Sequence, residues 1–181
     1  MPSTSFLLRV DLQGASPKIW RRFFVPPSIT LPELHRVVQA VMGWHRPRSW
    51  HFVIRRKCYP DTELMSEGSD MAKVALCSLV GRRGMIFQYI CQFEDTWKHR
   101  LTLSNDHFDS SKLDVDTMCV AGEGACPPRD VGGIEGYVEF LRAFEDPEHP
   151  DHYDILDEFG EDFDRDEFYL DRINASLRAL T

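Results

Sequence analysis

Hydrophobic and polar residues alternate in several short stretches of the chain, and this period of two predicts β-strands. Phe6–Leu12 places its apolar residues on one face, and Ile19–Val25 follows after a turn at residues 13–17, so the two stretches are expected to pair. Trp50–Ile54 alternates in the same way. Met85–Cys91 and Trp97–Leu103 predict a hairpin that extends the same sheet.

A helical period appears between Thr30 and Gly43, where apolar residues recur every three or four positions. Thr30 and Glu33 have the spacing of a capping box, with Pro32 in the first turn. Gly43 fits a C-terminal cap, because glycine readily adopts the left-handed conformation found there. These signals predict a helix that ends at Gly43 and turns one apolar face to the core.

The last third of the chain is acidic but rich in aromatic residues, so it is expected to fold rather than to form a disordered tail. Apolar residues between Tyr137 and Phe144 predict one helix. Asp164 and Glu167 predict the start of a terminal helix, whose apolar stripe continues to Leu180.

The stretch Cys119–Tyr137 interrupts these patterns, because it holds five of the eleven glycines and two adjacent prolines. Proline fixes φ and lacks an N–H, so the stretch predicts an elaborate loop, rather than a helix or strand, leading into a helix near Ile134. At least one of Gly132 and Gly133 is expected to need a positive φ.

The order of the predicted elements is a strand pair, a helix, further strands and terminal helices. Polar residues 61–71 and 105–115 predict loops, and Lys73–Val80 fits either a short helix or a strand. Together these elements predict an α+β fold: a single domain over residues 1–181, with a largely antiparallel sheet packed with helices and a C-terminal helical segment.

The net charge of −8 is distributed unevenly. Residues 1–60 hold ten lysines and arginines against two acidic residues, whereas residues 61–181 hold eleven against twenty-seven. The acidic part opposes nucleic acid as a partner, and the basic first third is the region that could bind it. An acidic partner could dock on the basic residues Arg46, Arg48, Arg55, Arg56 and Lys57.

Five cysteines without dense spacing fit reduced thiols in the cytoplasm better than a disulfide framework. No run of 18 apolar residues is present, so no membrane span is predicted, and the first residues lack the pattern of a signal peptide. We therefore expect a cytoplasmic protein without a membrane partner.

Several stretches together carry a family resemblance: PKIWRRFFVP at residues 17–26, LPELHRVVQAVMGW at 31–44, WHF at 50–52, FEDTWKHRLTL at 93–103, CVAGEGACPPRDVGGIEGY at 119–137 and INASL at 173–177. They resemble the plasmid pRiA4b ORF-3-like family over nearly the whole chain. The resemblance implies a compact α+β domain in a cytoplasmic protein, often linked to mobile elements. It implies no established activity.

Relatives in this family are sometimes labelled transposon passenger or resolvase-type (TnpR) proteins. A serine recombinase needs a serine nucleophile supported by arginines and a separate DNA-binding domain, and this chain has neither pattern. The chain also departs from the family pattern at Gln92, Glu94 and Val131, where the family has an acid, a glycine and a cysteine.

Asp95, His99 and Asp130 are the candidate catalytic residues, since carboxylates and an imidazole can serve hydrolysis or metal binding. The parity of His99 with Trp97 places it on the apolar face of its strand, where a histidine is more often a hydrogen-bonded core residue. Cys119, Cys126 and His99 offer zinc-binding atoms, but their spacing lacks the close pairs of a structural site. Neither a metal nor another cofactor is expected.

Candidate binding residues are Trp44, His51 and Trp97, together with Gly132 and Gly133 before the predicted helix. The sequence favours a non-enzymatic binding or interaction module whose partner is a protein or a small molecule. An accessory protein of a mobile element is one such module. The alternative is a metal-dependent hydrolase or nuclease that uses the Asp/His cluster.

Overall fold

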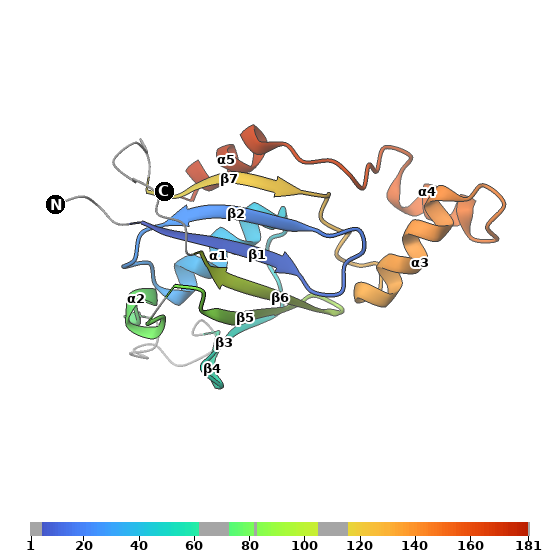
Figure 1. The fold of residues 1–181 in the computed structure, drawn as a ribbon. Coiled ribbons are helices and arrows are strands. Elements are labelled where there is room, and N and C mark those ends of the chain that lie inside the picture. The colour runs from blue at the N-terminus through green and yellow to red at the C-terminus, as the bar shows by residue number, and fades with distance from the viewer. Residues whose placement is uncertain (1–4, 62–72, 82, 105–115, 181) are drawn as a thin grey trace.

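The computed structural model describes residues 5–61, 73–81, 83–104 and 116–180, whose strands form one antiparallel sheet (Figure 1). The seven strands of these residues lie in the order β4-β3-β5-β6-β1-β2-β7. Their bounds are β1 Phe6–Leu12, β2 Trp20–Val25, β3 Ser49–Ile54, β4 Lys57–Pro60, β5 Ile86–Gln92, β6 Thr96–Leu103 and β7 Met118–Glu123. The predicted α+β fold with a largely antiparallel sheet is confirmed.

Five helices accompany the sheet in the described residues: α1 Leu31–Met42, α2 Leu76–Leu79, α3 Gly133–Glu145, α4 His152–Phe159 and α5 Leu170–Arg178. Helices α1 and α5 pack together behind the sheet, and α3 and α4 extend beyond one end of it (Figure 1). The opposite face, toward the viewer, carries no helix of the described residues. None of the described helices is both long and apolar enough to cross a membrane.

Helix α1 forms as its sequence predicts, with the Thr30–Glu33 capping box at its start and Gly43 as a left-handed cap at φ 82. Its apolar residues, among them the fully buried Leu34 and Val38, pack on the inward-facing side chains of the sheet. Because strand residues alternate between faces, the core lies on the side of α1, and the open face is more polar.

Two local predictions are wrong. Residues Cys119–Glu123 belong to edge strand β7 rather than to a loop, since β2 offers them a hydrogen-bonding partner across a register shift between Arg22 and Phe23. The terminal helix begins at Leu170 rather than at Asp164, whose oxygens instead accept hydrogen bonds within a turn. The predicted loops at 61–71 and 105–115 lie outside the described residues, apart from Asp61.

Candidate functional site

The three candidate catalytic residues, Asp95, His99 and Asp130, lie in different surroundings. His99 has no exposed surface and lies on the α1 side of the sheet, where its Nδ1 donates to the Tyr89 carbonyl oxygen at 3.3 Å. Asp95 is half-buried in the β5–β6 turn, and exposed Asp130 pairs with Arg129. Because His99 is closed to solvent, a solvent-open hydrolytic site cannot include all three residues.

The candidate zinc ligands Cys119, Cys126 and His99 likewise do not form a cluster. Within the described ranges, no group of three or more histidine, cysteine, aspartate or glutamate side chains could hold a metal ion. Burial raises the pKa of the Cys119 and Cys126 thiols, although the nearby Arg21 charge acts in the opposite direction. Both thiols are therefore protonated at neutral pH, whereas zinc binds thiolate.

The candidate binding residues are also dispersed. Trp97 is fully buried, and His51 is half-buried on the open face of the sheet. Gly132 and Gly133 open helix α3 with φ values of 90 and 68, which confirms the predicted need for a positive φ. Trp44 alone of these five lines the groove between α1 and α5.

This groove has a volume of about 720 Å³ and lies on the helical side of the sheet. It is bounded by α1, by α5 and by the loop that joins α1 to β3. Aromatic, charged and neutral polar side chains line it. They include His35, Gln39, Trp44, Arg46, Trp50 and Arg172. A concave site with a few convergent polar groups is the usual form of a small-molecule site.

A buried hydrogen-bond network forms part of the groove wall. The hydroxyl oxygen of Tyr89 lies 2.8 Å from His35 Nδ1 and accepts a hydrogen bond from Gln39 Nε2 at 2.9 Å. The His35 ring also stacks on Trp50, with ring centroids 4.4 Å apart and an interplanar angle of 8°. His35 and Gln39, one helical turn apart on α1, are thus hydrogen-bonded to Tyr89 of strand β5.

The protonation of this network follows from its burial. Burial lowers the pKa of His35 to about 4, and the charge of Arg36 adds to the shift, so the ring is neutral at pH 7. Burial raises the pKa of Tyr89 well above its ordinary value, so the phenol keeps its proton. Since the phenol accepts from Gln39, its own proton is available to His35 Nδ1, and in that arrangement Nε2 of His35 is the protonated nitrogen.

Gln39 is the unsatisfied member of the network. Its side chain is 4% exposed, and its Oε1 atom is buried without a hydrogen-bond partner among the described residues. A buried acceptor left unpaired costs about 1–3 kcal/mol. Gln39 also lines the groove, so this unpaired acceptor belongs to a residue of the groove wall.

The groove lining carries positive charge. Arg36, Arg46 and Arg172 line the groove, against Asp61 as the acidic residue of the lining. The exposed side chain of Arg46 makes no hydrogen bond or ion pair with another described residue. Its backbone adopts the left-handed conformation at φ 55, which a non-glycine residue rarely does. Such conformations are concentrated at functional sites.

Sequence reasoning missed His35, Gln39 and Tyr89. The available signal was a pair of polar residues four positions apart beside the apolar stripe of α1, together with a tyrosine on the buried face of its strand. No role was predicted for this pair from the sequence. For Arg46, the sequence predicted only that it could help to dock an acidic partner. In the structure it lines the groove.

Comparisons with known proteins agree on one relationship. A sequence model of the plasmid pRiA4b ORF-3-like proteins matches residues 4–172. The uncharacterized protein y4hQ of Sinorhizobium fredii is 34% identical over 177 residues, covering 96% of this chain and 90% of the relative. The crystal structure of MM3350 from Methanosarcina mazei, a protein of unknown function, has a TM-score of 0.75 and 27% identity, covering 92% of this chain and 96% of its own.

Proposed function

The chain belongs to the plasmid pRiA4b ORF-3-like family, and we propose that it is a binding module for a small organic acid that also carries a hydrogen-bond donor. The ligand is held in the groove between α1 and α5. The family's link to mobile elements gives such a module a setting as an accessory protein, but the proposal depends on the groove alone.

The observation that carries the proposal is the buried, unpaired Oε1 atom of Gln39, a residue that lines the groove. A ligand hydroxyl, amide or amine that donates to this oxygen removes the cost of leaving it unpaired. Gln39 is held in place by its own hydrogen bond to Tyr89, so little conformational entropy is lost when the ligand binds.

The acidic part of the ligand follows from the arginines. Arg46 and Arg172 bring positive charge to the groove, and a guanidinium can bind a carboxylate through two parallel hydrogen bonds. Neutral His35, with a pKa of about 4, is a weak base at pH 7, which favours binding over general-base catalysis.

A calorimetric titration with lactate, malate and glutamate as probes tests the proposal. We expect at least one probe to bind. Gln39→Met and Arg46→Gln should each weaken the binding of that probe by about tenfold, because each variant loses one hydrogen bond to the ligand. Arg48→Gln is the matched control, because Arg48 is an exposed arginine two positions away that pairs with Glu94.

Gln39→Met keeps the length of the side chain but removes the acceptor, so its unfolding free energy should be compared with that of the wild-type protein. A folded Gln39→Met variant that binds the probes as tightly as wild type would contradict the assignment of Oε1 as the recognition atom. Failure of all the probes, with the wild-type protein folded, would contradict the choice of an organic acid.

A further inference from the structure

We propose a second binding site, for a small phosphate monoester, on the open face of the sheet. A hollow of about 420 Å³ lies beside the β1–β2 hairpin and is lined by Arg9, Asp11, Gly14, Lys18 and Arg100 among its residues. Alternating strand residues point to opposite faces, so the hollow is separated from the groove by the sheet itself. The proposal is therefore independent of the proposed function.

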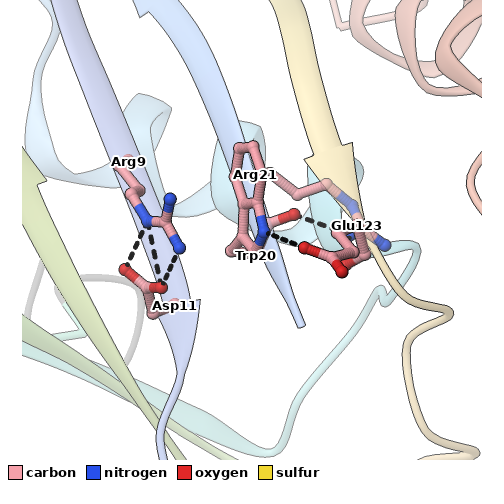
Figure 2. Close-up of polar contacts among 5 residues, drawn as sticks. All are labelled: Arg9, Asp11, Trp20, Arg21 and Glu123. Carbon is pink, nitrogen blue, oxygen red and sulfur yellow. Dashed lines mark hydrogen bonds and ion pairs between the residues drawn. The ribbon is translucent and has the colours of Figure 1, made fainter. Parts of the chain in front are cut away.

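Arg9 is held in place by Asp11, to which it is hydrogen-bonded (Figure 2), and by the ring of Trp20. Its Nε and Nη2 atoms donate to the Asp11 carboxylate at 3.0 and 2.7 Å. Its guanidinium lies over the Trp20 ring, 4.1 Å from the centroid, and the Trp20 indole donates to Glu123 at 2.8 Å. An arginine fixed in this way loses little entropy when its remaining N–H groups bind an anion.

The other two cations of the hollow are unpaired. The side chains of Lys18 and Arg100 are exposed, and neither has a hydrogen bond or ion pair with another described residue. Three cations against the Asp11 carboxylate give the lining a formal charge of about +2 at pH 7. A phosphate monoester carries about −1.5 to −2 at this pH, which matches the lining.

The net charge of the chain favours a compact anion over nucleic acid. The whole chain has a net charge of −8, which opposes the binding of an extended polyanion. Screening reduces the interaction between exposed charges beyond about 8 Å at physiological ionic strength. A single phosphate group within the hollow therefore experiences mainly its three nearby cations.

The test is a titration of the isotope-labelled full chain followed by NMR, with inorganic phosphate and glycerol 3-phosphate as separate probes. We expect both to shift the backbone amides of Gly14 and Ala15, which line the hollow, and the monoester to bind at least as tightly. Lys18→Gln and Arg100→Gln should each weaken binding by about tenfold.

Lys98→Gln is the matched control, because Lys98 is exposed on the same face of β6, two residues from Arg100, and does not line the hollow. Equal weakening by Lys98→Gln would show a diffuse charge effect and overturn the proposal. Binding of inorganic phosphate without the monoester would overturn the ligand class. Tighter binding of a single-stranded oligonucleotide, with shifts spread along β6 and β1, would identify a nucleic-acid surface instead.

Arg9→Lys separates geometry from charge. It keeps the charge of the hollow but loses the planar group that Asp11 and Trp20 hold, so it should weaken the monoester without changing the fold. Unchanged amide shifts away from the hollow verify the fold. An Arg9→Lys variant with wild-type affinity would refute the role given to the fixed guanidinium.

Discussion

Replacing His99 by glutamine should remove a pH dependence of stability that the buried imidazole gives to the wild-type protein. Burial lowers the pKa of His99 from 6.5 to about 4, although hydrogen bonds to the backbone of Tyr89 and Trp97 partly oppose the shift. In the unfolded chain the ring titrates near its ordinary value. As the pH falls from 6.5 to about 4, the unfolded state takes up a proton that the folded state does not, so the free energy of unfolding decreases.

The size of the effect follows from the same shift. One pKa unit corresponds to about 1.4 kcal/mol, so a shift from 6.5 to about 4 corresponds to about 3 kcal/mol lost by the lower end of the window. His99→Gln should therefore lose about 3 kcal/mol less than wild type. Its amide can still donate to the Tyr89 carbonyl, as Nδ1 of His99 does at 3.3 Å.

The assay is urea unfolding of both proteins at several pH values between about 7.5 and about 4. Other titrating groups, including His35 with its pKa of about 4, are present in both proteins and cancel in the difference. Parallel pH profiles for the two proteins would refute the reasoning. So would an NMR titration of the His99 ring that gave its ordinary pKa, because a neutral buried imidazole is the premise.

Three further predictions concern the backbone and the buried arginine. Gly136→Ala should cost about 3 kcal/mol or more in urea unfolding, because its Cβ would overlap the Val131 carbonyl, whereas Gly43→Ala has open space and should lose only about 1 kcal/mol from its positive φ. Arg21→Lys should lower stability by about 3 kcal/mol, since one ammonium cannot reach the four carbonyl oxygens that the guanidinium binds; an unchanged unfolding midpoint would contradict this. Gly132→Val should cost about 1–3 kcal/mol through strain at φ 90, and thermal unfolding equal to wild type would be the contrary result.

The elements that were predicted correctly are those whose signals are local. Helix α1 has its cap residues, its proline and its apolar stripe within Thr30–Gly43, and the structure forms each of these features. Alternation likewise identified β1, β5 and β6. Edge strand β7 was missed because Gly122 suggested a loop, yet a side chain at that position would overlap the Phe168 ring, which lies 46 positions away in the chain. The reason for the glycine is tertiary.

The groove could not be predicted for a related reason. His35 and Gln39 are ordinary polar residues on a helix until Tyr89 is placed beside them, and the pairs are separated by 54 and 50 positions. The same packing that buries His35 lowers its pKa. Periodicity identifies which face of each element is buried, but not which residues of two buried faces meet.

The loop between β7 and α3, which is rich in glycine and proline, acts mainly as a scaffold. Its carbonyl oxygens turn inward, where long side chains from the core donate to them. Arg21 donates to Gly124 at 2.7 Å, and the Trp44 indole donates to Pro127 at 2.9 Å. Because the carbonyl of a proline can accept while its nitrogen has no N–H, Pro127 can lie buried without an unpaired donor.

Trp44 connects this scaffold to the groove. Its indole N–H is committed to the loop, while its ring lines the groove between α1 and α5. The ring also packs against Trp97 at a tilt, with centroids 5.0 Å apart, and against His99 edge-on, with centroids 5.5 Å apart. These contacts fix the orientation of the Trp44 ring. The glycines and prolines are thus needed to position a wall of the groove, and the groups that would contact a ligand come from elements whose sequences look ordinary.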